Sequence, residues 1–474
     1  MSKKKSLFLF GLVFIFALAL VACGDNNNDN NAGGDDTPSE EAPAGDVATN
    51  DATGDDFDGE VLEVNLWAFT DEVPNMMRMF LENNPHYDAR FEVNFVEIAD
   101  TDGAYMTALD LALESGGRDV PHLFTAEAAF ALRYTQGTMS HHVLPYTELG
   151  IDVDRLIAEA DLASYAVEIG TRNGEVVGLG FQATGGAMIY RRSIAQSVFG
   201  TDDPAEIQDI TGPGWERFLD AARELDAAGY SAVSGAGDLW QVVRTSGSPW
   251  VVDGELVIDP IRENFMDLHR ALYQEGLMND AGAWSEAWNA DMGGMGEREV
   301  FSFFGPAWLI NYVMINHVGD TYGDWAVTVP PTGFFWGGTW LMANADTPEE
   351  MRGFLGSFIE WVTLDSSTEG LQYLFANGLF DPDNETKDVV ASGTVMNISN
   401  GELSVLGGQN MFDIFGPAGQ YADGTALTEY DLQINNWFID QSQEYAQGTK
   451  SREEAIRDFM QAVADNTAIV VNFD

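Results

Sequence analysis

Lysine is nearly absent from this sequence. Beyond the lysines at positions 3–5 only Lys387 and Lys450 occur, and 22 basic residues face 76 acidic ones, which gives a formal net charge of −54. A field of this sign repels nucleic acids and anionic lipid surfaces, so the composition argues against nucleic acid or a bare membrane surface as partners. An acidic, lysine-poor composition is typical of proteins that work at high salt or high pH.

Cysteine is also scarce, since Cys23 is the only cysteine in the chain. A disulfide framework within one chain is therefore excluded. Lys3, Lys4 and Lys5 precede an apolar run over residues 7–19, which is followed by Leu20-Val21-Ala22-Cys23-Gly24. This order is typical of a secretory signal. The run is short for a membrane-spanning helix, which needs about 20 apolar residues.

The Leu-Val-Ala-Cys box resembles the cleavage site of bacterial lipoproteins. The resemblance implies a signal peptide over residues 1–22 and a lipidated Cys23 that carries acyl chains such as palmitate. We therefore expect an extracytoplasmic protein, anchored by lipid to the outer face of the cell membrane. Residues 23–60 contain almost no large apolar side chain, so we expect an acidic, disordered tether after the anchor.

Regular structure is expected to begin at residue 61. Apolar alternation predicts strands over residues 61–66, 91–98 and 120–124, and helical spacing predicts helices over 73–83 and 105–114. Strands that alternate with helices in this order indicate an α/β fold with a mainly parallel sheet. Capping boxes predict further helices after Thr347 and after Ser451.

Motifs of catalysis, metal binding and cofactor binding are missing from the sequence. It lacks Gly-x-Ser-x-Gly, a phosphate-binding loop and a dinucleotide fingerprint, and its six histidines are scattered. We therefore predict no catalytic residue, no metal and no cofactor. Paired carboxylates of a surface glycoside hydrolase remain an alternative, because acidic residues are so numerous that pairs occur by chance.

Several segments together resemble the family 1 extracellular solute-binding proteins, the maltose-binding-like sugar receptors of ABC importers. The likeness covers nearly the whole region after the tether, and it rests on the order and spacing of these segments: 127–130 (Glu-Ala-Ala-Phe), 176–182, 188–192 (Met-Ile-Tyr-Arg-Arg), 305–308 (Gly-Pro-Ala-Trp), 325–331 and 337–340 (Gly-Gly-Thr-Trp).

The resemblance implies a two-lobe α/β fold of the periplasmic-binding-protein type, with a hinge and a cleft between the lobes. Lobe one is expected over residues 61–184 and 341–395, and lobe two over residues 185–340 and 396–474. The segment 188–192 resembles the family's first crossing between lobes, and the region from Pro330 to Trp340 resembles the second. Ligand capture would then close the lobes by bending at the hinge.

Sugar recognition needs flat apolar faces and side chains that hydrogen-bond hydroxyl groups. The chain has 12 tryptophans, several of them near expected loops or strand ends. Each candidate residue can also be explained as an ordinary core or helix-end residue. The resemblance is incomplete around Gln182, because the family often has an aspartate in this segment and this sequence has none there. The expected ligand-binding residues are Trp67, Asp71, Glu72, Glu127, Gln182, Trp240, Trp284, Trp288, Trp308, Trp336, Trp340 and Asp413.

The sequence thus predicts a non-enzymatic receptor that captures a di- or oligosaccharide outside the membrane and delivers it to the permease of an ABC transporter. The number of tryptophans favours several sugar rings over one. A polyamine or peptide receptor is a second alternative within the binding class, and a polyamine would suit the negative charge.

Overall fold

The computed structural model describes residues 59–100, 103–381, 386–424 and 427–473. The predicted signal peptide and Cys23, and nearly all of the predicted tether, lie outside the described residues. Two mixed sheets organise the rest, as the α/β prediction requires. No described helix is long and apolar enough to cross a bilayer.

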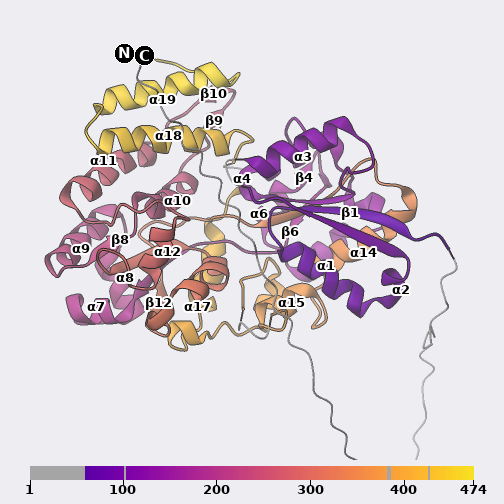
Figure 1. The fold of residues 1–474 in the computed structure, drawn as a ribbon, viewed down its shortest axis with the longest axis horizontal. Helices are drawn as coiled ribbons and strands as arrows, with labels where there is room; N and C mark the ends of the chain where they lie inside the picture. Colours follow the sequence, from indigo (N-terminus) through magenta and orange to yellow (C-terminus); the bar gives the residue numbers. More distant parts are fainter. Residues whose placement is uncertain (1–58, 101–102, 382–385, 425–426, 474) are drawn as a thin grey trace, which may run out of the picture. The chain divides into compact units, whose positions relative to one another are not determined.

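The first sheet has the strand order β2-β1-β3-β13-β6. Figure 1 labels β1 and β6 of this sheet. β1 runs parallel to β2 and β3, whereas β13 is antiparallel to both of its neighbours, β3 and β6. The five strands are β1 (Leu62–Ala68), β2 (Phe91–Glu97), β3 (Leu123–Glu127), β6 (Leu179–Gly180) and β13 (Thr339–Ala343).

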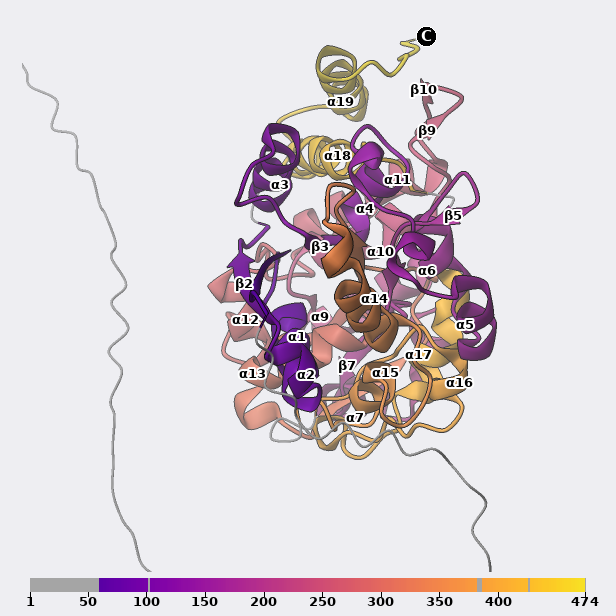
Figure 2. The ribbon, with the colours of Figure 1, turned by 90° about the vertical axis from the view of Figure 1, so that its right-hand side faces the viewer.

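Helices from three parts of the chain accompany this sheet, and α14 and α15 lie side by side (Figure 2). They are α1 (Glu72–Asn83), α2 (Pro85–Asp88), α3 (Ala104–Ser115), α4 (Ala128–Thr135), α5 (Val153–Ala160), α6 (Ser164–Ile169), α14 (Glu349–Thr363), α15 (Leu371–Ala376) and α16 (Gly393–Met396). The strands and helices predicted for residues 61–115 are confirmed to within about three residues at each end.

The second sheet has the strand order β12-β7-β11-β8. β7 is antiparallel to β12 and β11, and β11 is parallel to β8. The strands are β7 (Ala187–Arg191), β8 (Ser231–Val233), β11 (Val300–Gly305) and β12 (Trp325–Thr328). Two short hairpins complete the strands: β4 (Thr171–Arg172) with β5 (Glu175–Val176), and β9 (Val251–Val252) with β10 (Glu255–Leu256).

The second sheet has its own helices, and α18 packs between α11 and α19. They are α7 (Arg192–Phe199), α8 (Pro204–Thr211), α9 (Trp215–Ala227), α10 (Ala236–Ser246), α11 (Pro260–Glu275), α12 (Glu286–Met292), α13 (Ile315–His317), α17 (Phe412–Ala418), α18 (Asp431–Ala446) and α19 (Arg452–Asn466). A π-helical segment, η3 (Leu309–Met314), precedes α13, and single turns are η1 (Ser140–His142), η2 (Tyr146–Leu149), η4 (Gly319–Thr321), η5 (Ser404–Leu406) and η6 (Gly419–Tyr421).

The chain passes from the first sheet to the second through residues 181–186 and returns through residues 329–338. The two segments contact each other, since Gly185 bridges to Phe335 and Trp336 donates its backbone N–H to the carbonyl of Thr184. Residues 188–191, expected to be a crossing, are β7 inside the second sheet, so the connecting segment precedes them.

Of the two predicted capping boxes, only the second is confirmed. The Ser451 hydroxyl accepts from the backbone N–H of Glu454, and the Glu454 carboxylate accepts from the N–H of Ser451. The first is wrong, because the helix N-cap is Pro348 and the Thr347 hydroxyl donates instead to the carbonyl of His122, 3.3 Å away. The Thr347 hydroxyl, which a capping box would need at the start of the helix, makes a tertiary hydrogen bond instead.

Candidate ligand-binding site

Four tryptophans pack together near the segment that returns to the first sheet. The rings of Trp284 and Trp308 lie parallel, with centroids 6.1 Å apart and planes inclined by 4°. Trp336 meets both edge-on, at 4.7 Å from Trp308 and 5.8 Å from Trp284, and Trp288 lies 5.4 Å from Trp284. We call Trp284, Trp288, Trp308 and Trp336 the tryptophan cluster, and all four were predicted as ligand-binding residues.

Local structure fixes each ring of the cluster. Trp308 follows β11 and opens the π-helical segment, a kind of helix that is frequent at functional sites, and its indole N–H donates to the carbonyl of Trp336 at 3.0 Å. Trp288 is buried and donates its indole N–H to Asp238 at 2.9 Å. Trp284 has a left-handed backbone, with φ at 69°, and is 55% exposed. Trp288 therefore supports the cluster from inside, whereas Trp284 presents its ring to solvent.

Glu127 is the residue of the first sheet that lies beside the tryptophan cluster. It ends β3 and caps α4, because its carboxylate accepts from the backbone N–H of Ala129 at 2.8 Å. A Cβ atom on Gly337 would lie 3.4 Å from the Oε1 of Glu127 and 3.3 Å from the indole nitrogen of Trp308. The carboxylate and the indole thus converge on one glycine of the connecting segment, whose φ is 77°.

Arg244 on α10 supplies the positive charge at this point. Burial raises the pKa of Glu127, and the electrostatic attraction of Arg244 lowers it. The Arg244 guanidinium lies 5.9 Å above the ring of Trp336, and its Nε–H is buried without a hydrogen-bond partner. The Glu127 carboxylate at the end of β3 and the Arg244 guanidinium on α10 therefore flank the tryptophan cluster together.

Further buried polar atoms without partners lie on the same elements. They are the indole N–H of Trp67 on β1, the hydroxyl of Thr125 on β3, the amide oxygen of Gln241 on α10 and the amide oxygen of Asn289 on α12. Buried polar groups are nearly always hydrogen-bonded, so such a set calls for an explanation. Unpartnered atoms of the same kind also occur away from the cluster, on Trp215, Arg262 and His269, so the tryptophan cluster and Glu127 define the candidate site.

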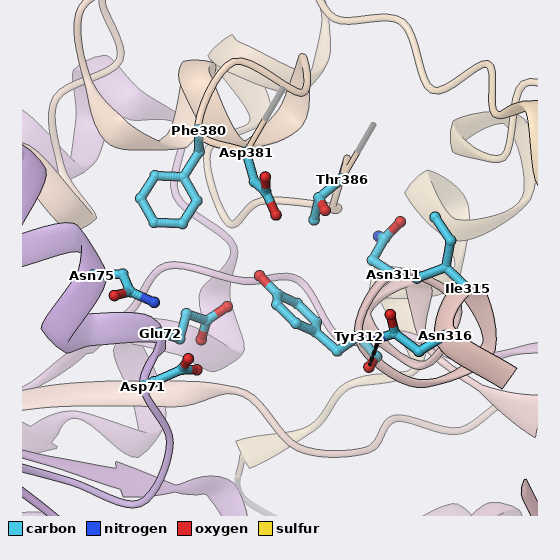
Figure 3. A pocket seen from close by; sticks show the side chains of 10 residues that line it. All are labelled: Asp71, Glu72, Asn75, Asn311, Tyr312, Ile315, Asn316, Phe380, Asp381 and Thr386. Carbon is cyan, nitrogen blue, oxygen red and sulfur yellow. Dashed lines mark hydrogen bonds between the residues drawn. The ribbon is translucent and has the colours of Figure 1, made fainter. Parts of the chain in front are cut away.

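A pocket of about 190 Å³ lies between the start of α1 and the π-helical segment (Figure 3). The predicted residues Asp71 and Glu72 line it from α1, and the π-helical segment and the chain after α15 close it. Its lining residues are Asp71, Glu72, Asn75, Asn311, Tyr312, Ile315, Asn316, Phe380, Asp381 and Thr386, and we call this space the acidic pocket.

Two buried carboxyl groups beside the acidic pocket are hard to ionise. Burial raises the pKa of Glu72 to about 7, a rise to which Asp71 adds and which the Tyr312 hydroxyl opposes. Burial and the charge of Glu72 raise the pKa of Asp388 to about 8. The predicted residue Gln182 is buried here, and its amide N–H donates to Asp388 at 3.1 Å. Gln182 therefore holds a carboxyl group of the site in place.

Three predicted residues lie away from these groups. Trp240 is buried among the helices beside the second sheet, and its ring centroid lies 5.1 Å from that of Phe438. Trp340 is fully buried in β13, where its indole N–H donates to the carbonyl of Ala166. Asp413 lies on the exposed side of α17 and accepts from Asn410. Packing and hydrogen bonds within the protein account for all three, so the candidate site does not include them.

Sequence reasoning missed Arg244, Asn311, Tyr312 and Asp388. Arg244 carries a faint signal, since it is a basic residue one helical turn after Trp240 in a chain that has few. Asp388 and Tyr312 carry none, because nothing in their local sequence shows that they meet Glu72 on a distant helix. Among the described residues, no group of three histidine, aspartate or glutamate side chains is placed to hold a metal ion.

Comparison with known proteins identifies the family. The model of the family described as "Bacterial extracellular solute-binding protein" matches residues 75–378, nearly two thirds of the chain. No curated protein sequence matches.

Among solved structures, the galacto-N-biose-/lacto-N-biose I-binding protein of Bifidobacterium longum, in complex with lacto-N-biose, is 14% identical with a TM-score of 0.66, over 88% of this chain and 100% of that one. The ABC transporter associated binding protein of B. animalis subsp. lactis, in complex with β-1,6-galactobiose, is 18% identical with a TM-score of 0.60, over 86% and 97%. These likenesses show that the chain has the two-lobe fold of periplasmic binding proteins.

Proteins of the matched family bind solutes outside the cytoplasm and do not convert them, which rules out the glycoside hydrolase alternative. Because the family model covers well over half of the sequence and the fold agrees with it, this chain belongs to the bacterial extracellular solute-binding proteins.

Proposed function

We propose that this protein is a carbohydrate receptor, which captures a di- or oligosaccharide and delivers it to the permease of an ABC transporter. The tryptophan cluster beside Glu127 and Arg244 is the observation that carries the proposal. The two solved relatives described above hold lacto-N-biose and β-1,6-galactobiose, and both are named as parts of ABC transporters.

The chemistry of the candidate site suits a saccharide. The C–H face of a sugar ring packs against an indole, while its hydroxyl groups both donate and accept hydrogen bonds. Trp284 and Trp308 supply ring faces, and Glu127 and Arg244 supply an acceptor and donors next to them. Faces from more than one tryptophan favour a ligand of at least two sugar rings.

Capture would close the two lobes over the ligand. The proposed boundaries are residues 61–184 with 341–395 for lobe one, and 185–340 with 396–474 for lobe two. Glu127 then belongs to lobe one and Trp308 to lobe two, so a sugar held by both would favour the closed arrangement. The connecting segments 181–186 and 329–338 are where we expect the hinge to bend.

The lipid anchor is part of the proposal. Cys23 would carry acyl chains, more than one of which is needed for lasting attachment, and would hold the receptor at the outer face of the membrane near its permease. Metabolic labelling with a palmitate analogue tests this. We expect label and membrane association in the unaltered chain and loss of both in Cys23→Ser. Equal labelling of the two chains would contradict the anchor.

Calorimetric titration of the full chain in detergent with mono-, di- and oligosaccharides, spermidine and short peptides tests the ligand class. We expect one oligosaccharide to bind, to raise the unfolding temperature by mass action, and to be recovered unchanged. Binding of spermidine or a peptide with no saccharide bound would keep the family and overturn the carbohydrate proposal.

A further inference from the structure

The acidic pocket has polar atoms that no described residue satisfies. Glu72 is only 9% exposed, and its Oε1 has no hydrogen-bond partner. Asn311 is 3% exposed, and its amide oxygen also has none. Both residues line the pocket, and Figure 3 shows the Glu72 carboxylate directed toward the Tyr312 hydroxyl in its middle. When Glu72 is ionised, both unpartnered atoms are acceptors, so the group that would satisfy them is a donor.

Two other buried carboxylates of the protein have an arginine nearby, which Glu72 and Asp388 lack. Glu127 is attracted by Arg244, and Asp431 is attracted by Arg262 and Arg244. Asp238 has no cation, yet it accepts from the indole of Trp288 and the backbone of Gly235. Asp388 likewise accepts from the Gln182 amide and the backbone N–H of Val389, but no described cationic side chain acts on it or on Glu72, and the two repel each other. Among the described residues, no lysine or arginine lines the acidic pocket.

A positive charge carried by a ligand would supply this donor, because no described residue does. A bare metal ion fits poorly, because no three acidic or histidine side chains among the described residues are placed to hold one. An ammonium group carries one charge and three N–H donors, which suits a mixed set of carboxylate, hydroxyl and amide acceptors. About 190 Å³ is also more room than a lone ion needs.

The position of the acidic pocket indicates which kind of ligand would carry the ammonium group. Tyr312, which lines the pocket, follows Trp308 of the tryptophan cluster by about one turn of the same helical segment. Asp71 and Glu72 stand at the start of α1, a few residues after Trp67 and its unpartnered indole N–H. A ligand that reaches from the cluster to the acidic pocket would bring a sugar ring to the first and its amino group to the second.

We propose that the acidic pocket binds a protonated amino group and that the ligand is an amino sugar with its amine free, alone or within an oligosaccharide. The inference rests on the proposed carbohydrate function and deepens it. A plain polyamine would satisfy the same carboxylates but would leave the ring faces of Trp284 and Trp308 unused. The tryptophan cluster is therefore the reason to choose the amino sugar.

The test compares ligands that differ at one group. Glucose, glucosamine and N-acetylglucosamine, the same three forms of galactose, and the β-1,4-linked dimers of the glucose series are titrated into the full chain at pH 7, together with spermidine. We expect at least one free-amine sugar to bind about tenfold or more tighter than its hydroxyl and acetylated counterparts, because only the amine carries charge. Comparison of ligands needs no variant, so it does not depend on how a substitution folds.

Glu72→Gln then locates the amine, with Glu349→Gln at the exposed start of α14 as the matched control. We expect the first variant to lose about tenfold or more in affinity for the amino sugar, and the control to lose nothing.

The remaining outcomes separate the two proposals. A neutral or acetylated sugar that binds as tightly as its amine, or a Glu72→Gln variant that keeps full affinity for the amine, overturns the amino-group pocket and leaves the carbohydrate function standing. Failure of every saccharide overturns both proposals, and binding of spermidine alone overturns both in favour of a polyamine receptor.

Discussion

Trp284 and Trp308 lie with their ring planes within 4° of parallel and their centroids 6.1 Å apart, although 24 residues separate them in the sequence. Trp308 is fixed by its hydrogen bond to the carbonyl of Trp336, whereas Trp284 is held by ring contacts and is more than half exposed. One face is thus rigid and the other can adapt to what binds.

Trp284→Ala should weaken saccharide binding without unfolding the protein. An aromatic face at an interface is worth about 1–3 kcal/mol, which corresponds to roughly fivefold to 150-fold in affinity. Because Trp284 is 55% exposed, we expect the unfolding temperature to change little. Calorimetry gives the first quantity and circular dichroism on heating the second. Tyr322→Ala, another exposed aromatic residue, should leave affinity unchanged, and equal losses in both variants would contradict the assignment.

Glu127→Gln should lower affinity by about tenfold or more, since the neutral amide loses a charge-assisted acceptor and leaves Arg244 with only the attraction of Asp431. The helix cap would survive, because an amide oxygen can still accept from the N–H of Ala129. Glu148→Gln is the matched control, as it removes one member of an exposed ion pair with Arg352. Unaltered binding by Glu127→Gln would remove this residue from the site.

Gly337→Ala and Gly353→Ala should have opposite effects on stability. Gly337 has a φ of 77°, so a side chain there is strained, and its Cβ would press on Trp308 and Glu127. We expect a loss of about 1 kcal/mol or more in the free energy of unfolding, together with weaker binding. Gly353 lies exposed in α14 with open space around it, so alanine should add about 0.5–1 kcal/mol.

The ligand-free protein should lose stability as the pH rises from about 4 to 8. The folded state keeps a proton on Asp388 up to a pKa of about 8, whereas the ordinary value is 3.8, so the folded state binds more protons over this interval. The free energy of unfolding must then fall with rising pH, and Glu72, with a pKa raised to about 7, adds to the fall.

Asp388→Asn removes the larger of these two contributions, and denaturant unfolding at several pH values measures the result. We expect a flatter pH dependence in this variant than in the unaltered chain, while Asp413→Asn on the surface of α17 should keep the original slope. Identical slopes in the unaltered chain and Asp388→Asn would show that Asp388 is ionised throughout.

The order of strands and helices near the start of the fold could be predicted because it depends on local apolar spacing. The third strand shows the limit, since it was expected over residues 120–124 and is β3, Leu123–Glu127. Pro121 has no N–H to give a sheet ladder, and pairing begins where Leu123 meets Leu66. The register of a strand is a property of its partner as much as of its own residues.

The candidate site could be predicted only in part for a similar reason. Trp308 and Trp340 both follow glycine-containing segments, yet Trp340 is fully buried in β13 while Trp308 joins the tryptophan cluster. A tryptophan offers the same apolar surface to a core and to a ligand, so its sequence neighbours do not decide between them. The sequence could not show that Arg244 lies near Glu127, because α10 packs beside the second sheet and β3 is a strand of the first.

The hydrogen bond from Trp308 to the carbonyl of Trp336 gives the protein an optical reporter of its own. Indole emission depends on the polarity around the ring and on neighbouring indoles, and four of them meet here beside the connecting segment. Under the proposed function, a bound ligand would displace water from these rings and shift the segment that holds one of them. Intrinsic fluorescence should therefore report the proposed capture and lobe closure in the same signal, with no dye and no label attached.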